Sequence, residues 1–200
     1  AGIGVLEAKH QHISRGTNMQ VGDKILVNGY IGDHGMAVLG KRNELDFQSE
    51  IVSDCAGLNG FIANILKIRS GTSARTSIHF MRDATRGGVA TVVCEMAQHK
   101  PFGILLDEIN IPVRESVNGL CELLGFDPLY VANEGKVVIV TAHDDANEVL
   151  HVMQQHPLGT HSAIIGEIVT DYPGTVVLQT QVGGRRIVDM LAGAQLPRIC

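Results

Sequence analysis

The order of the apolar segments constrains the fold of this chain more than any other feature of its sequence. Up to about residue 155, runs typical of strands alternate with runs that have helical spacing of apolar residues. Two β-branched runs, 163–169 and 175–180, then follow one another with only a Tyr-Pro-Gly turn between them. This order predicts an α+β domain, built as a two-layer sandwich in which a mixed or antiparallel sheet carries helices on one face.

The same patterns predict the individual elements. Residues 3–6 have the pattern of the end of a strand, and a polar stretch, 7–20, follows them. Further strands are expected over 24–29, 77–81, 102–106, 136–141, 163–169 and 175–180. Helices are expected over 36–40, 58–68, 87–97 and 113–124, and from a cap at Asp144 or Asp145 to about residue 155.

Composition narrows the classes of function. The 200 residues are 44% hydrophobic, which is ample for a core, and the formal net charge of −5 disfavours a nucleic-acid partner. There is no apolar run long enough to predict a membrane span. The four cysteines form no CxxC pair, so we expect no metal site and a reduced, cytoplasmic setting. Cys94 and Cys121 lie in apolar helical patterns and are expected to be buried.

Two glycine-rich turns lead into predicted helices, one at 32–35 and one at 83–88. The second follows a strand directly, so its backbone N–H groups can converge on an anion at a helix N-terminus, and Arg86 can add a bidentate contact to phosphate. The alternative is an Asp or Thr helix cap followed by glycines that close packing requires. Neither turn has the residues of a P-loop or of a dinucleotide-binding fingerprint.

Two further residues are candidates for chemistry. Glu134 is the one carboxylate of a turn, 131–136, that precedes a predicted buried strand, and it is a candidate proton acceptor. The alternative is a solvated turn residue. Of the nine histidines, only His34 lies in a glycine-framed turn, whereas the pair His10 and His12 is expected to face water.

The chain ends in a cysteine. The stretch 191–200 contains Ala, Gly and Pro and lacks the apolar periodicity of a packed element, so a mobile tail is expected there.

Taken together, these segments resemble the HypE family of hydrogenase maturation proteins, within the superfamily of aminoimidazole ribonucleotide synthetase. The Asp-Ala-Thr-Arg-Gly-Gly turn marks the superfamily broadly, and the Pro-Arg-Ile-Cys ending is specific to the family. The matching stretches run through nearly the whole chain: Gly32–Gly35, Ser53–Asn59, Arg82–Gly88, Phe126–Lys136, Gly184–Asp189 and Pro197–Cys200.

The resemblance implies a reaction and its partners. Family members receive a carbamoyl group on the C-terminal cysteine from a HypF-type carbamoyltransferase, and use ATP to convert it to a thiocyanate. The cyanide passes to iron on a HypC–HypD complex for the nickel–iron hydrogenase centre. By this resemblance Cys200 is the carrier and Glu134 the candidate base. The candidates for cofactor binding are His34, Asp83, Arg86, Gly87 and Gly88.

The resemblance also implies a division of the chain. Family proteins have an N-terminal domain that supplies most of the acidic residues for Mg²⁺ and ATP, and a homodimer is expected at full length. Residues 1–20 are therefore expected to be a remnant or linker from that domain, 21–190 a C-terminal α/β domain and 191–200 the tail. The fragment by itself is expected to be inactive. Two alternatives stay open: another ATP-using synthetase of the superfamily, and a non-catalytic carrier that presents Cys200 to partners.

Overall fold

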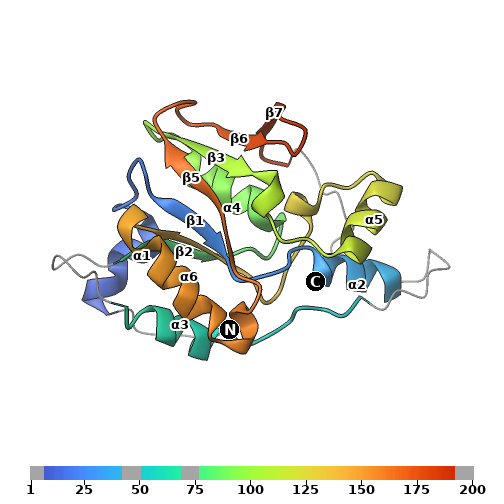
Figure 1. Ribbon diagram of the computed structural model, residues 1–200, viewed down its shortest axis with the longest axis horizontal. Helices are drawn as coiled ribbons and strands as arrows, with labels where there is room; N and C mark the ends of the chain where they lie inside the picture. The colour runs from blue at the N-terminus through green and yellow to red at the C-terminus, as the bar shows by residue number, and fades with distance from the viewer. Residues whose placement is uncertain (1–6, 42–50, 69–76, 192–200) are drawn as a thin grey trace.

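The computed structural model describes residues 7–41, 51–68 and 77–191, and within them one seven-stranded sheet forms the centre of the molecule (Figure 1). Its order is β2-β4-β1-β5-β3-β6-β7. The strands are β1 (Lys24–Val27), β2 (Ile78–Asp83), β3 (Gly103–Asp107), β4 (Val137–Thr141), β5 (Ala163–Val169), β6 (Val176–Gln179) and β7 (Arg185–Val188).

The sheet is mixed. β3 and β6 pair in parallel, and the other neighbouring pairs are antiparallel. The turn after β5 does not form a hairpin with β6, because β3 lies between these two strands. The connection crosses the start of β3 at Gly103, where an added Cβ would lie 2.1 Å from the carbonyl oxygen of Asp171. The predicted α+β class with a mixed sheet is confirmed.

The helices agree with the predicted ranges to within a few residues, except α1, which was not predicted. They are α1 (Gln11–Arg15), α2 (Asp33–Lys41), α3 (Asn59–Ile65), α4 (Gly88–Ala97), α5 (Glu115–Leu124) and α6 (Ala146–Gln154). Short 3₁₀ turns are η1 (Ala8–His10), η2 (Glu108–Asn110), η3 (Pro128–Tyr130), η4 (His143–Asp145) and η5 (Pro157–Gly159). Asp145 occupies the N-cap position of α6, as predicted, but its side chain makes no capping hydrogen bond.

Helices lie on both faces of the sheet, whereas the sequence predicted helices on one face only. Alternate residues of β1 point to opposite faces: Ile25 and Val27 pack in the core that contains α4, whereas Leu26 packs in a second core. Phe61 of α3 and Met153 of α6 belong to that second core. Figure 1 shows α4 behind the sheet and α3 and α6 in front of it. Helices therefore cover both faces around β1 and β4, because these central strands are apolar on both sides.

Candidate functional site

The turns predicted to carry function meet around one buried side chain, Asn133. Its amide oxygen accepts the N–H of Gly32 at 2.8 Å, and its amide nitrogen donates to the carbonyl of Ala84 at 2.9 Å. Its backbone N–H donates to the carbonyl of Thr85 at 3.2 Å. Asn133 is 1% exposed. A single amide thus joins the turn at 32–35, the turn at 83–88 and the turn that carries Glu134.

The turn between β2 and α4 is shaped by its two glycines. Gly87 and Gly88 have φ angles of +71° and +61°, in the left-handed region that favours glycine. An added Cβ on Gly88 would lie 2.4 Å from the carbonyl oxygen of Leu129, so close packing does require this glycine. In the described structure no side chain caps α4 at Gly87, and no acidic residue occupies the first turn. The start of α4 therefore combines tight packing with the polarity that favours an anion.

Asp83 and Arg86 flank this turn with exposed side chains. The hydroxyl of Thr85 donates a hydrogen bond to the Asp83 carboxylate. Asp83 and Arg86 thus lie at the surface, beside the start of α4.

His34 lies in the first turn of α2 and is half-buried. Its Nδ1 is 2.9 Å from the hydroxyl oxygen of Ser53. The same hydroxyl oxygen accepts the backbone N–H of Cys55 at 3.2 Å. The segment 53–55 thus fixes the ring of His34.

Glu134 is held by the same segment. Its backbone N–H donates to Oδ1 of Asp54 at 3.0 Å, while its side chain is half-buried. The second oxygen of Asp54 lies 2.9 Å from Nζ of Lys136. The structure thus brings His34, Glu134 and the 83–88 turn to one end of the sheet, joined through Ser53, Asp54 and Asn133.

A second buried amide, Asn28, supports this arrangement from the end of β1. Its nitrogen donates to the carbonyls of Gly135 and Leu158 at 3.0 and 3.1 Å, and its oxygen accepts the N–H of Val137 at 2.8 Å. Sequence reasoning named neither Asn28 nor Asn133 as a site residue. The available signal was a polar amide beside an apolar strand, since such a residue must find partners when it is buried.

A pocket of about 370 Å³ opens beside these groups. The guanidinium carbon of Arg114 lies 4.2 Å from the centre of the Tyr30 ring, and its Nε donates to Oδ2 of Asp33 at 3.0 Å. Burial raises the pKa of the Asp33 carboxyl, and the hydrogen bond from Arg114 partly opposes that effect. Lys136 and Asp54 also line this pocket, so it adjoins the Glu134 turn.

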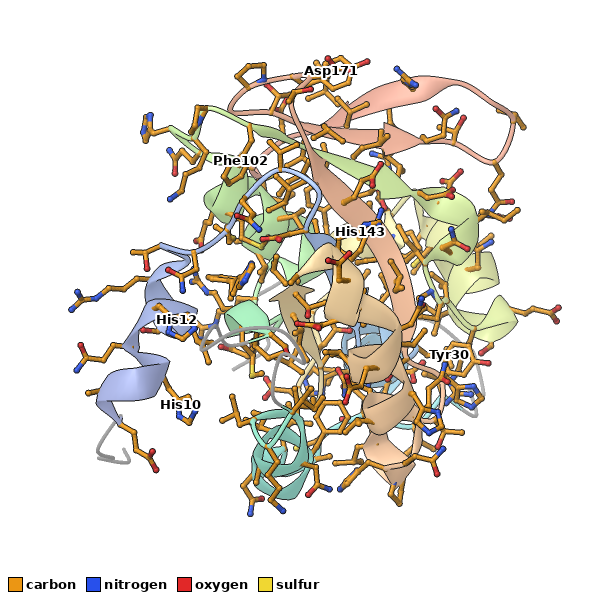
Figure 2. The ribbon with its side chains drawn as sticks, turned by 60° about the vertical axis from the view of Figure 1, so that its left-hand side comes forward. His10, His12, Tyr30, Phe102, His143 and Asp171 are labelled. Atoms are coloured by element: carbon orange, nitrogen blue, oxygen red, sulfur yellow. The ribbon has the colours of Figure 1, made fainter. Side chains whose placement is uncertain are left out.

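Other predicted residues lie elsewhere. Figure 2 shows His10, at the end of η1, and His12, on α1, on the far side of the molecule from Tyr30. His12 Nε2 is 3.0 Å from the carbonyl oxygen of Ile78. Cys200 lies outside the described residues. Cys94 and Cys121 are buried, as predicted, and burial raises the pKa of each thiol to about 11.

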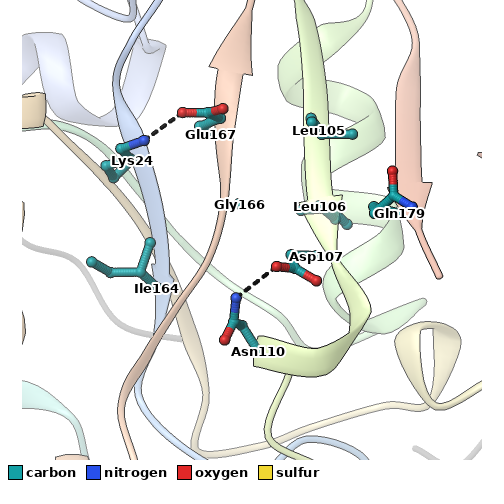
Figure 3. Close-up of a pocket in the computed structure, with 9 residues that line it drawn as sticks. All are labelled: Lys24, Leu105, Leu106, Asp107, Asn110, Ile164, Gly166, Glu167 and Gln179. Atoms are coloured by element: carbon teal, nitrogen blue, oxygen red, sulfur yellow. Dashed lines mark hydrogen bonds and ion pairs between the residues drawn. The ribbon is translucent and has the colours of Figure 1, made fainter. Parts of the chain in front are cut away.

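Another hollow, of about 240 Å³, lies on the sheet away from the predicted residues (Figure 3). Lys24 and Glu167 form an ion pair on its wall, and Asn110 donates to Asp107 at 2.8 Å. It contains none of the candidate residues.

Known proteins resemble this chain over nearly its whole length. The family model described as AIR synthase related protein, C-terminal domain, matches residues 20–179. A protein named carbamoyl dehydratase HypE, from Cupriavidus necator, is 45% identical over 199 residues, which cover 100% of this chain and 54% of that protein. The chain therefore spans about half the length of the curated relatives it matches.

Solved structures agree as well. A crystal structure of HypE in complex with ATP matches with a TM-score of 0.81 and 38% identity, over 94% of this chain and 55% of that one. A HypE–HypF complex matches with a TM-score of 0.79 and 42% identity, over 87% and 54%. The resemblance to HypE proteins is thus confirmed. The chain belongs to the family of AIR synthase related proteins, as a C-terminal domain similar to that of HypE.

Proposed function

We propose that this chain is the C-terminal part of an ATP-dependent carbamoyl dehydratase. It converts a carbamoyl group carried on Cys200 to a thiocyanate and so supplies a cyanide ligand for nickel–iron hydrogenase maturation. The observation that carries the proposal is the match along the whole chain to proteins named carbamoyl dehydratase. In this proposal residues 1–20 are the link to an upstream ATP-binding domain, 21–190 the C-terminal domain and 191–200 the tail with the carrier.

The proposed chemistry needs an activated oxygen and a proton acceptor. ATP supplies the phosphoryl group that turns the carboxamide oxygen into a good leaving group. Loss of phosphate and of the N–H protons then leaves a carbon–nitrogen triple bond on the sulfur of Cys200. Glu134 is the proposed base, because its carboxylate is half-exposed while its backbone is fixed by Asp54.

The groups proposed to contact the nucleotide are those around the start of α4. The uncapped N-terminus of α4 at Gly87 and Gly88 suits a phosphate oxygen, and Arg86 is an exposed cation beside it. His34 and Asp83 complete the proposed set. A HypE solved with ATP supports nucleotide binding in the family. By the resemblance to the family, we assign most Mg²⁺ ligands to the upstream domain.

The proposed partners follow the relatives. A HypE–HypF complex supports a HypF-type carbamoyltransferase as the donor of the carbamoyl group. A HypC–HypD complex as acceptor and a full-length homodimer complete the proposal. In the described part of the chain, no helix has the length and apolar character needed to cross a bilayer. The unpaired thiols of Cys55, Cys94 and Cys121 fit the proposed cytoplasmic location.

The competing function is a carrier without catalysis, which presents Cys200 to other enzymes. The two functions differ in what happens after carbamoylation. We therefore propose to extend the chain at its N-terminus with an upstream half like that of the relatives, and to incubate it with the carbamoyltransferase, carbamoyl phosphate and ATP. Mass spectrometry of the C-terminal peptide follows the modification of Cys200.

A dehydratase gives carbamoyl-cysteine and then, with ATP, thiocyanate. A carrier stops at carbamoyl-cysteine, whatever the ATP concentration. Cys200→Ala is the matched control, and it should give neither product. If neither product forms on the unsubstituted chain, both functions are wrong.

A further inference from the structure

We propose that Asp54 is a positioning residue for this reaction, which orients Glu134 toward the substrate. The inference rests on the proposed function, because it takes Glu134 as the base. It concerns a residue that touches neither the carbamoyl group nor ATP in the proposal, and that acts through the backbone of the 134–136 turn.

The two carboxylate oxygens of Asp54 hold the two ends of this turn. Oδ1 accepts the N–H of Glu134 at 3.0 Å, and Oδ2 pairs with Nζ of Lys136 at 2.9 Å. The Asp54 side chain is 4% exposed and that of Lys136 is 11% exposed. One carboxylate thus anchors the turn at both ends, through a hydrogen bond at residue 134 and an ion pair at residue 136.

Gly135, between them, is held from two sides. An added Cβ there would lie 2.0 Å from the carbonyl oxygen of Asp54, so the two backbones are in direct contact. On the other side the carbonyl of Gly135 accepts a hydrogen bond from Asn28 at 3.0 Å. The backbone of the turn therefore has little freedom, although the Glu134 side chain itself is half-exposed.

This is the arrangement that a general base requires. Its carboxylate must reach the proton, so it stays accessible, while its direction is set by groups behind it. The segment that contains Asp54 also holds His34, because Ser53 contacts His34 Nδ1 at 2.9 Å. One short segment thus sets the relative positions of two candidate site residues.

A matched control lies at the other end of β1. Asp23 is also a buried carboxylate, it also accepts a backbone N–H, from Gln20 at 2.9 Å, and it also contacts a basic side chain, Nδ1 of His79, at 2.7 Å. It has no contact with the Glu134 turn among the interactions of the described residues. Asp23→Asn therefore tests the loss of a buried carboxylate without disturbing the base.

The kinetic experiment uses the extended chain, carbamoylated on Cys200, and follows thiocyanate formation in a single turnover. Asp54→Ala should slow dehydration about thirtyfold or more, since a small misplacement of a catalytic group can cost about a hundredfold. The KM for ATP should change less than about threefold, because the loss is one of orientation and not of binding. Asp54→Asn keeps an acceptor for the Glu134 N–H and should recover part of the rate. Asp23→Asn should stay within about twofold of the unsubstituted chain.

A second measurement reads the contact directly in the 200-residue chain. Hydrogen exchange of the Glu134 amide should become at least about tenfold faster in Asp54→Ala, and stay protected in Asp54→Asn and Asp23→Asn, because only the first variant removes the acceptor.

Two outcomes separate the hypotheses. If Asp54→Ala dehydrates at the normal rate, or loses no more than Asp23→Asn, the positioning role is wrong and the proposed function stands. If the unsubstituted chain forms no thiocyanate, the proposed function fails, and the positioning role falls with it.

Discussion

The two ends of β1 both contain buried polar side chains, but they use them differently. At its start, Asp23 accepts the N–H of Gln20 and contacts the ring of His79. These contacts join β1 only to the turn before it and to β2. Beyond its other end, Asn28 and Asn133 bind backbone groups from several segments that are distant in sequence. The first arrangement joins two neighbours, whereas the second fixes the positions of loops.

The chemistry of the side chains explains this difference. An amide offers donors and an acceptor at once, so a single asparagine can bind both N–H and carbonyl groups of different loops. It also avoids the cost of burying a net charge. The groups proposed to react, His34 and Glu134, lie half-exposed on this amide-supported end. The end supported by amides is therefore the one that presents the candidate functional groups.

The largest expected effect is on the rate of thiocyanate formation, and it tests whether the two ends of β1 differ in function. In the extended chain, Glu134→Gln should leave carbamoylation of Cys200 intact and slow thiocyanate formation about a hundredfold or more, because loss of a positioned base typically costs 10²–10⁴. Single-turnover mass spectrometry of the C-terminal peptide measures both steps. Asp23→Asn is the matched change at the other end of β1 and should keep the rate. A normal rate in Glu134→Gln would make Glu134 a turn residue only.

The sequence predicted the elements well where a single pattern decided them. The β-branched run of β4 is buried at each position, and the predicted range differs from the observed one by a single residue. β7 was not predicted, because its residue types do not follow its alternating burial: Ile187 is exposed, whereas Arg186 is half-buried. The short helix α1 was also missed, since one buried residue, Ile13, gives no periodicity to read.

The site was predictable only in part. Glycine-rich turns and the lone carboxylate of the 131–136 turn marked His34, Glu134 and the start of α4, and the structure brings these together. The roles of Asp54 and of the two supporting amides could not be assigned, because they depend on partners that are distant in the chain. The hydrogen bond between Asp54 and Glu134 joins residues eighty positions apart. Such a contact depends on the topology of the fold, which cannot be derived reliably from one sequence.

An effect of intermediate size is expected on the free energy of unfolding when Asn133 is replaced. Asn133→Ala removes the partners of the Gly32 N–H and the Ala84 carbonyl, which are buried with it. Unsatisfied buried groups of this kind cost about 1–3 kcal/mol each, so the free energy of unfolding should fall by about 3 kcal/mol. Urea denaturation measures this directly. The exposed Asn118→Ala on α5 is the control and should change stability by less than about 0.5 kcal/mol. A loss below about 1 kcal/mol in Asn133→Ala would show that the loops hold without the amide.

The smallest expected effect concerns the charged rim of the same end. Burial raises the pKa of Asp33 above its ordinary value of 3.8 in the folded chain, and Arg114 partly opposes this. A carboxyl whose pKa is raised on folding binds its proton more tightly in the native state than in the unfolded one. Its contribution to stability is therefore present at low pH and is lost as the pH rises from about 3.8 through the folded pKa.

Asp33→Asn has no such titration, so the wild-type chain should lose free energy of unfolding relative to this variant as the pH rises through that window. The difference should become constant once the pH exceeds the folded pKa. Urea denaturation of both chains, at a series of pH values from 3.8 to neutral, measures the difference. Arg114→Gln supplies the second arm: it removes the group that lowers the pKa of Asp33, so the window should extend to higher pH. A difference between wild type and Asp33→Asn that grows with pH in favour of wild type would mean that the ion pair with Arg114 outweighs burial.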